Sequence, residues 1–189
     1  MIRKLFGVLL ALIVALIVIG FLLPTTVVIE RERVVDHPRE VVFEVLGDLR
    51  HFTQWAPWLN RHSDMSWRLE GPAQGVGATL VWNETPEAQA SRLWIVGVEP
   101  PRRVDMKLEL SGNEADSWLA VVDGAGGREV RWGMRIEFGA LDLVGRYVGL
   151  ILPGVVGSDY REGLERLDEY LARSPGRVPA LPEDLAGEQ

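Results

Sequence analysis

Three histidines are the side chains best suited to acid–base or metal chemistry in this sequence: His37, His51 and His62. They lie 14 and 11 positions apart, so no two of them have the i, i+4 spacing of a helical ligand pair. We expect such scattered histidines at the surface. The sequence holds no cysteine, which excludes a thiolate metal site, a cysteine nucleophile and a disulfide. We therefore predict no metal site and no cofactor.

The acidic and glycine-containing motifs do not form a catalytic pattern either. Asp48-Leu49-Arg50 is typical of a helix junction, where the carboxylate caps free amides and the guanidinium pairs locally. Gly75-Val76-Gly77 lacks the third glycine of a dinucleotide-binding fingerprint, and we interpret it as a turn. The sequence also lacks a G-x-S-x-G elbow, a Walker-type loop and a carboxylate cluster for two metals. These motifs predict no catalytic residue.

Aromatic and sulfur-containing side chains remain as candidates, because seven tryptophans are many for a chain of 189 residues. Indoles combine apolar contact with an N–H donor, and methionine adapts its shape to a ligand. The alternative for each of them is ordinary core packing. The side chains that we predict to line a ligand cavity are Trp55, Trp58, Trp94, Met106, Trp132, Met134 and Tyr160.

An apolar stretch near the N-terminus predicts a membrane anchor. Leu5 to Leu23 contains no charged or polar side chain, and at about 1.5 Å per residue it spans roughly 28 Å, the hydrocarbon thickness of a bilayer. The stretch is longer than the core of a signal peptide and no A-x-A-like site follows it, so we expect an uncleaved anchor. Arg3 and Lys4 precede it. The positive-inside bias then predicts a single-pass protein of the cell (inner) membrane, with a cytoplasmic N-terminus and an extracytoplasmic domain.

The rest of the chain has the composition of one acidic domain and a tail. Residues 25–172 carry 16 Arg and Lys against 24 Asp and Glu, a net charge of −8, which argues against nucleic acid as a partner. Residues 173–189 lack apolar periodicity, so we expect a flexible C-terminal tail. The predicted divisions are 1–24 for the cytoplasmic end and the anchor, 25–172 for the domain, and 173–189 for the tail.

Apolar periodicity divides the domain into one strand, two short helices, six further strands and a long helix. The strands are expected at 26–35, 65–69, 77–83, 91–98, 103–110, 116–122 and 128–138. The helices are expected at 38–47, 49–54 and 143–171, and Pro153-Gly154 should kink or interrupt the last one. Two strands alternate between a dry and a wet face, which is typical of an antiparallel sheet covered on one side. We predict an α+β helix-grip fold: a curved antiparallel sheet around the long C-terminal helix, preceded by one transmembrane helix.

Seven local sequences, taken in order, resemble a known family. They are Val27–Val35, His37-Pro38-Arg39-Glu40-Val41-Val42-Phe43, Asp48-Leu49-Arg50, Trp55-Ala56-Pro57-Trp58, Gly71-Pro72, Gly75-Val76-Gly77-Ala78 with Trp82, and Gly157-Ser158-Asp159-Tyr160-Arg161-Glu162-Gly163-Leu164. The family is the SRPBCC superfamily of START-like helix-grip proteins, and within it the polyketide cyclase/dehydrase-like group. The resemblance covers about residues 25–172. The chain is similar to membrane-anchored members of the group, which carry one N-terminal helix ahead of the domain. The fold that it implies hosts enzymes, lipid carriers and regulators.

We interpret the chain as a membrane-anchored, exported domain that binds a small apolar or lipid-like ligand in a helix-grip cavity, without catalysis. We expect Gly163, on the last helix, to border this cavity. One alternative is a polyketide cyclase/dehydratase-like enzyme, which needs an acid or a base in the cavity, and the two dry strand faces carry none. Another is a protein-interaction module at the membrane surface, with a filled cavity and wet-face residues such as Arg131 and Arg135. The sequence identifies no protein partner.

Overall fold

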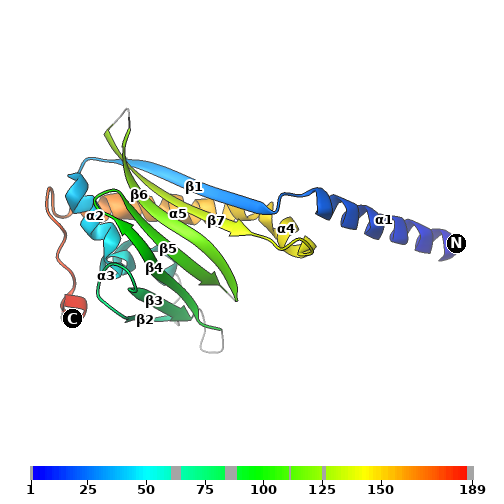
Figure 1. Cartoon of the computed structure of the whole chain (residues 1–189), viewed down its shortest axis with the longest axis horizontal. Helices are drawn as coiled ribbons and strands as arrows, with labels where there is room; N and C mark the ends of the chain where they lie inside the picture. Colours follow the sequence, from blue (N-terminus) through cyan, green and yellow to red (C-terminus); the bar gives the residue numbers. More distant parts are fainter. Residues whose placement is uncertain (1, 61–64, 84–88, 111, 125–126, 187–189) are drawn as a thin grey trace.

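The computed structural model describes residues 2–60, 65–83, 89–110, 112–124 and 127–186 of the chain. Its centre is a curved sheet of seven antiparallel strands in the order β1-β7-β6-β5-β4-β3-β2 (Figure 1). The strands are β1 (Thr26–Val35), β2 (Ser66–Glu70), β3 (Thr79–Asn83), β4 (Ser91–Glu99), β5 (Arg103–Leu110), β6 (Asn113–Gly124) and β7 (Gly127–Glu137).

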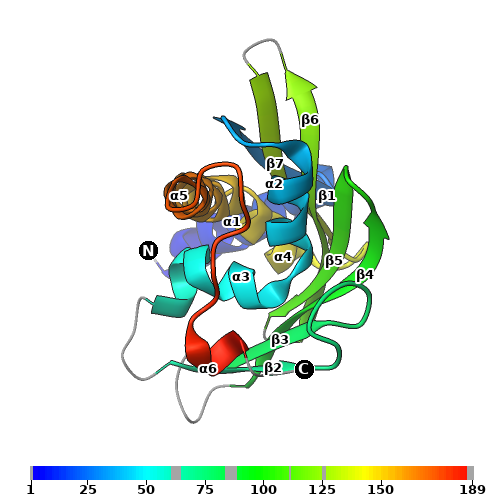
Figure 2. The same ribbon diagram turned by 90° about the vertical axis from the view of Figure 1, so that its left-hand side faces the viewer.

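Helices cover one face of this sheet. They are α2 (Arg39–Gly47), α3 (Leu49–Trp55), the 3₁₀ turn η1 (Pro57–Asn60) and the long α5 (Leu152–Ala172), while α1 (Ile2–Leu22), α4 (Leu143–Gly149) and α6 (Glu183–Ala186) lie at the two ends of the molecule. Figure 2 shows α2, α3 and α5 on the same side of the sheet. The predicted α+β fold, a curved sheet around a long C-terminal helix, is confirmed.

Several strand boundaries differ from the predicted ones, and the starts of β3 and β6 differ by two and three residues. β3 begins at Thr79 rather than at residue 77, because Gly77 has a φ of 93°, a left-handed conformation that a strand does not use. β6 begins at Asn113 rather than at residue 116, because its first residues continue the antiparallel pairing with β5 as far as Leu110. Neither change alters which side chains face the helices.

α5 lies along β1 and packs its apolar stripe into the concave face of the sheet. The stripe is buried and consists of Tyr160, Leu164, Leu167 and Leu171, as its helical spacing predicts. Two arginines of β1 hold the helix in place. Arg33 Nε donates to Asp168 Oδ2 at 2.9 Å, and Arg31 Nη2 donates to the Pro153 carbonyl at 3.2 Å.

The C-terminal helical region is interrupted just before Pro153-Gly154, where the sequence predicts a kink or an interruption. α4 ends at Gly149 and α5 begins at Leu152, so the break precedes Pro153. Pro153 occupies the first turn of α5, where its missing N–H has no helical partner to lose. Asp142 caps the start of α4 by accepting a hydrogen bond from the Gly145 N–H at 2.8 Å.

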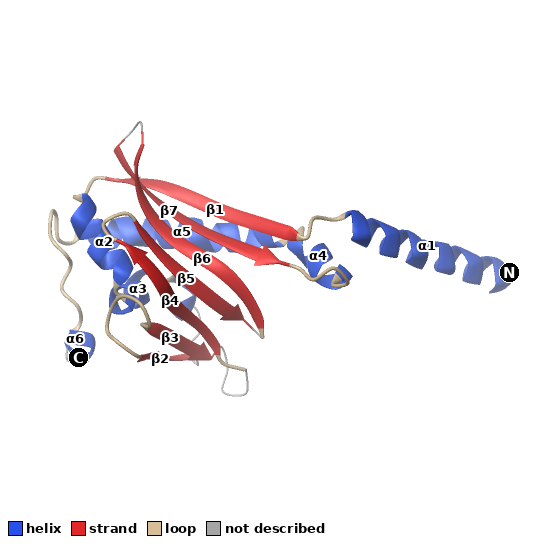
Figure 3. Cartoon of the chain, viewed as in Figure 1, coloured by secondary structure: helices blue, strands red, loops and turns tan. Residues whose placement is uncertain are grey.

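α1 projects from one end of the domain, beyond the place where β1 begins (Figure 3). It is long and apolar enough to span a membrane, and most of its large side chains are exposed. α6 lies at the opposite end of the molecule (Figure 1). Leu185 of α6 is buried and Val178 packs against the core, so this segment makes apolar contacts that its sequence pattern does not predict. The flexibility of residues 173–189 stays a prediction.

Candidate functional site

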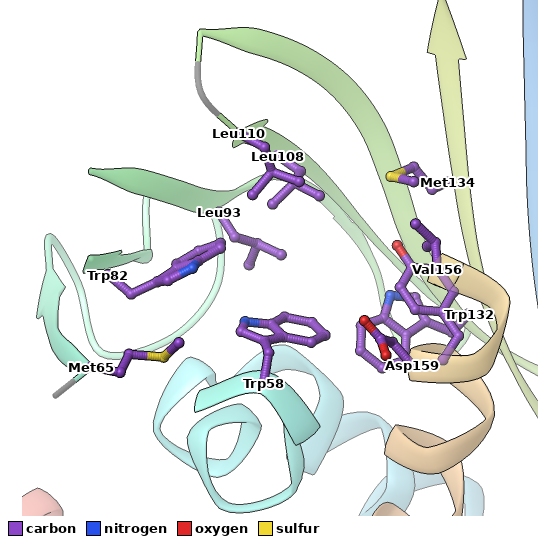
Figure 4. Close-up of a pocket in the computed structure, with 11 residues that line it drawn as sticks. Trp58, Met65, Trp82, Leu93, Leu108, Leu110, Trp132, Met134, Val156 and Asp159 are labelled. Atoms are coloured by element: carbon purple, nitrogen blue, oxygen red, sulfur yellow. The ribbon is translucent and has the colours of Figure 1, made fainter. Parts of the chain in front are cut away.

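A cavity of about 230 Å³ lies between α5, η1 and the concave face of the sheet (Figure 4). Its walls are almost entirely apolar or aromatic and consist of Trp58, Met65, Trp82, Leu93, Leu108, Leu110, Trp132, Met134, Val156, Asp159 and Tyr160. Pockets for drug-sized ligands usually measure roughly 300 to 1,000 Å³. The cavity is therefore suited to a small molecule or to one portion of a larger apolar molecule.

The alternation of the strands supplies the sheet side of the cavity. Residues two apart on a strand point to the same face, so Leu108 of β5 shares the inner face with Val104 and Met106. In the same way, Trp132 and Met134 of β7 both point inward and are buried. The dry faces that the sequence indicates for these two strands are confirmed, and they form the wall opposite α5.

α5 closes the cavity with three side chains at helical spacing, Val156, Asp159 and Tyr160. The ring of Tyr160 stacks on the indole of Trp132, with centroids 4.0 Å apart and planes 7° from parallel. The Tyr160 hydroxyl is hydrogen-bonded to Ser117, whose Oγ donates to the Gly133 carbonyl at 2.9 Å. Burial raises the pKa of Tyr160 well above its usual value, so its hydroxyl stays protonated at neutral pH.

Two tryptophans of the cavity have indole nitrogens with unused hydrogen-bonding capacity. Nε1 of Trp58 and Nε1 of Trp132 are both buried, and neither has a hydrogen-bond partner among the described residues. In Figure 4 the nitrogen of Trp58 is at the end of the ring that faces Trp82. A buried N–H without an acceptor costs free energy, roughly 1 to 3 kcal/mol. A ligand with an acceptor oxygen would recover part of that cost.

The structure brings four of the seven predicted residues to the cavity: Trp58, Trp132, Met134 and Tyr160. Trp55 and Met106 are fully buried but pack behind its walls, where Trp55 meets the Trp132 ring edge-on with centroids 5.2 Å apart. For these two residues the alternative of core packing is the correct one. That the four lining residues bind a ligand stays a prediction.

The prediction that Trp94 lines the cavity is wrong. Its neighbours on β4, Leu93 and Ile95, are buried on the inner face, so the pleat places Trp94 on the outer face of the sheet. There it is only half-buried, and the guanidinium of Arg92 lies over its ring at 4.9 Å from the centroid. Tryptophan content alone does not distinguish the two faces of a strand.

Several residues line the cavity that were not predicted from the sequence, among them Leu93, Trp82 and Asp159. Leu93 follows from the inward alternation of β4, a signal that was available in the sequence. Asp159 follows from helical spacing, since it lies three residues after Val156 and next to Tyr160. The inner faces of β5 and β7 carry no titratable side chain. Asp159, which lies on α5, supplies one to the cavity.

Gly163 does not border the cavity, contrary to the prediction. It is buried, and a Cβ atom there would be 2.6 Å from Cζ3 of Trp132 and 3.2 Å from Cδ of Pro57. The glycine instead allows α5 to approach the indole closely. A large residue at this position would disrupt the core before it could fill the ligand space.

Asp48 and Arg50 form the predicted helix junction. The Asp48 carboxylate accepts the Arg50 backbone N–H at 2.9 Å and caps α3, and the Arg50 guanidinium donates to the same carboxylate at 2.7 Å through Nη2. The carboxylate is buried and fully engaged, so the pair holds α2 against α3 and has a structural role.

The prediction of surface histidines is wrong for His37 and His51, which are 7% and 4% exposed, whereas His62 lies outside the described residues. A hydrogen bond of 2.7 Å joins the Tyr170 hydroxyl to Nδ1 of His51. Burial lowers the pKa of His51 below its usual value of 6.5, with Asp48 opposing the change and Arg50 adding to it. Burial likewise raises the pKa of Tyr170, to about 12. Both side chains are therefore neutral at pH 7 and belong to the core.

No group of three or more His, Asp or Glu side chains able to hold a metal ion occurs within residues 2–60, 65–83, 89–110, 112–124 and 127–186. The polar groups at the cavity are Asp159, the Tyr160 hydroxyl and the indole nitrogens. This set favours an uncharged or weakly polar organic ligand.

A protein-family model described as "Polyketide cyclase / dehydrase and lipid transport" matches residues 26–172. No curated protein sequence matches the chain. The match covers the sheet, α2 to α5 and the whole cavity, and excludes α1 and α6.

Solved structures share the fold at low sequence identity. A protein of unknown function from Staphylococcus aureus has a TM-score of 0.59 at 11% identity, covering 79% of this chain and 95% of its own. A Rhodobacter sphaeroides protein has a TM-score of 0.54 at 19% identity, covering 78% and 94%. The di-domain ARO/CYC StfQ from the steffimycin biosynthetic pathway has a TM-score of 0.56 at 13% identity, covering 79% of this chain and 51% of its own.

Proposed function

The chain belongs to the polyketide cyclase/dehydrase and lipid transport family, and from this premise we propose that its domain binds a small apolar or lipid-like molecule without transforming it. The observation that carries the proposal is the cavity itself. Its walls are apolar, and two buried indole nitrogens, of Trp58 and Trp132, lack an acceptor within the described part of the chain. A chain or ring with one carbonyl or ether oxygen would fill the space and satisfy one of these donors.

The proposal also places the domain on a membrane. α1 is the anchor, with Arg3 and Lys4 on the cytoplasmic side of the inner membrane and the domain from residue 25 onward outside the cytoplasm. A reporter enzyme that is active only after export, fused behind Gln189, tests this orientation. Reporter activity is the expected result, and activity of a cytoplasm-specific reporter at the same position would overturn it.

Ligand binding is tested by photolabelling the full chain in lipid nanodiscs with a diazirine derivative of palmitic acid. The labelled residues are then mapped by mass spectrometry. We expect saturable labels on cavity residues such as Met65, Leu108 and Met134, and none on Trp94, which faces outward. Labels on α1, which contacts lipid in any case, serve as the internal reference.

A pair of adjacent residues on α5 offers a matched control. Val156 lines the cavity, whereas Val155 is 58% exposed and does not line it. We expect Val156→Trp to reduce labelling of Met134 at least tenfold, and Val155→Trp to leave it unchanged. Wild-type protein without saturable cavity labels would defeat the proposal and favour the protein-interaction module.

A second candidate, a cyclase- or dehydratase-like enzyme, is favoured by one observation. Asp159 lines the cavity beside Tyr160, and a carboxylate there is placed to move a proton on a bound carbonyl compound. The test is incubation of the full chain with a linear poly-β-ketone, followed by mass spectrometry of the products. Cyclised or dehydrated product above the protein-free amount from wild type, and only the protein-free amount from Asp159→Asn, with equal photolabelling of both, would establish the enzyme. Equal amounts of product with and without protein would exclude it for that substrate class.

A further inference from the structure

Exposed apolar side chains gather on α4, on the turns that flank it and on the start of α5. We call this set the α4 surface, and it consists of Leu141, Val144, Val148, Leu150, Ile151 and Val155. Their exposed fractions range from 46% to 83%. Between residues 141 and 157 the only charged side chains are Asp142, which caps α4, and Arg146, which is buried. Soluble domains rarely leave a contiguous apolar patch of this kind in water.

The α4 surface is held beside the C-terminal half of α1. The Tyr147 hydroxyl donates to the Leu16 carbonyl at 2.6 Å, across the contact between the two helices. Gly20 permits the close approach, because a Cβ atom there would be 3.2 Å from Cε2 of Tyr147 and 3.3 Å from Cβ of Leu143. Figure 1 shows α4 at the end of the domain from which α1 projects.

Arg146 fixes this arrangement through the backbone of α1. Its Nη1 donates to the carbonyls of Phe21 and Gly20 at 3.2 and 3.4 Å, and its Nη2 donates to the Ala140 carbonyl at 2.8 Å. The guanidinium thus lies at the negative end of the α1 dipole, where a positive charge is favoured. Arg146 is the one cation between residues 141 and 157, and carbonyl oxygens compensate its charge, so it does not oppose contact with lipid.

The depth of α4 follows from its contact with Leu16. This residue lies six positions before Leu22, the end of α1, which corresponds to about 9 Å along the helix. Helices that lie in a membrane interface bury their apolar face about 5 to 10 Å into the headgroup and acyl boundary. If α1 spans the bilayer, α4 therefore lies at interfacial depth. Tyr147 then lies at the membrane–water interface, where aromatic side chains are enriched.

We propose that the α4 surface inserts into the lipid leaflet from which α1 emerges, and so fixes how the domain sits on the membrane. The inference rests on the membrane anchoring of the proposed function and adds a second, non-spanning contact. Val155 belongs to the α4 surface and the next residue, Val156, lines the cavity. The docked domain therefore holds one wall of its cavity close to the lipid.

The absence of native cysteine makes the test direct, since each single-cysteine variant has one labelling position. The full chain is reconstituted in phosphatidylethanolamine/phosphatidylglycerol vesicles, and an environment-sensitive fluorophore is attached at Val144→Cys or Val155→Cys. The matched control is Val76→Cys, because Val76 and Val155 are both 58% exposed and only Val155 lies on the α4 surface. A label at Val14→Cys reports on α1. Brominated lipids then quench every label that contacts acyl chains.

We expect blue-shifted emission and at least twofold quenching at positions 14, 144 and 155, and neither effect at position 76. Quenching at position 14 without quenching at 144 and 155 would overturn this inference and leave the anchor intact. A blue shift at 144 without quenching would also overturn it, because protein rather than lipid would cover the surface. No quenching at position 14 would overturn both the membrane anchor and this inference. The ligand-binding proposal would be unaffected, because it is tested separately by photolabelling of the cavity.

Discussion

Gly163 lies directly against the indole of Trp132, and a Cβ atom on the glycine would be 2.6 Å from Cζ3 of the ring. The same indole stacks on Tyr160 on one side of the helix and meets Trp55 and Phe52 edge-on. The position of the glycine therefore sets the distance between α5 and β7. That distance in turn determines how much space remains for a ligand.

The first prediction concerns this contact. Gly163→Ala should lower the free energy of unfolding by roughly 1 to 3 kcal/mol, because the added methyl group overpacks the core. The measurement is thermal or denaturant unfolding of the full chain in detergent. Gly154→Ala is the control on the same helix, since nothing lies within 4 Å of its Cβ position, and it should be neutral or slightly stabilising. Equal stability of the two variants would contradict the close contact.

The second prediction concerns the unpartnered indole of Trp58. Trp58→Phe keeps an aromatic wall and removes one of the two unpartnered N–H groups, so it should reduce the preference for ligands that carry an acceptor oxygen. A hydrogen bond contributes about 0.5 to 1.5 kcal/mol, a factor of roughly 2 to 10 in affinity. The measurement is competition by 2-undecanone and by undecane against the diazirine fatty acid in nanodiscs.

The wild-type protein should prefer the ketone over the alkane, and Trp58→Phe should show a smaller preference, because only the Trp132 indole donor remains. Trp94→Phe is the matched control, because Trp94 lies on the outer face of the sheet and its indole is remote from the cavity. A ketone preference as large in Trp58→Phe as in the wild type would show that this nitrogen does not bond the ligand.

The third prediction is a pH dependence of stability from His51. Burial lowers the pKa of this histidine in the folded state below 6.5, so the unfolded state binds the proton more readily. The unfolding free energy should therefore fall as the pH drops through 6.5, by no more than about 1.4 kcal/mol per pH unit. His51→Asn, which can still hydrogen-bond Tyr170 but does not titrate, should show a shallower loss between pH 7 and pH 5 in chemical denaturation. Identical slopes would exclude His51 as the source.

The fold was predictable from the sequence because its signals are periodic. The dry faces of β5 and β7 and the stripe on α5 follow from alternation and helical spacing, and together they require a sheet that closes on one helix. The N-terminal helix follows from length and composition alone. Each of these features depends on local sequence, which is why the strand and helix order is confirmed.

The site was only partly predictable, because it depends on which residues of separate elements meet. Trp94 and Trp132 are the same residue type, but Trp94 points to the outer face of the sheet and Trp132 to the inner face. Only the pleat of each strand determines this difference. Gly163 and Asp159 are four residues apart on α5, but Gly163 packs against Trp132 whereas Asp159 lines the cavity. The difference arises because Trp132 forms the end of the cavity. The contact between α1 and α4 joins Leu16 and Tyr147, which are 131 positions apart in the sequence. No local sequence pattern predicts a contact at such a separation.

The fourth prediction concerns the C-terminal segment. Leu185 is 5% exposed although it belongs to a helix of four residues, α6. Leu185→Ala should lower the unfolding free energy by about 1 kcal/mol or more, since the loss of a buried leucine in a full core costs about 2 to 5 kcal/mol. The neighbouring Leu181→Ala, at a half-buried position, should cost less. An unchanged melting temperature for Leu185→Ala would instead support a tail without stabilising contacts.

The fifth prediction concerns Arg146, which joins the anchor to the domain. Arg146→Met retains an apolar stem but removes the donors to the carbonyls of Gly20 and Phe21, so α1 should change its angle to the domain more freely. Spin labels at Val14→Cys and Val76→Cys in reconstituted protein give the distance distribution between the two parts. We expect a broader distribution in Arg146→Met than in the wild type, and no broadening in Arg161→Met, an exposed arginine of α5. Equal widths in all three proteins would show that the carbonyl contacts do not hold the anchor.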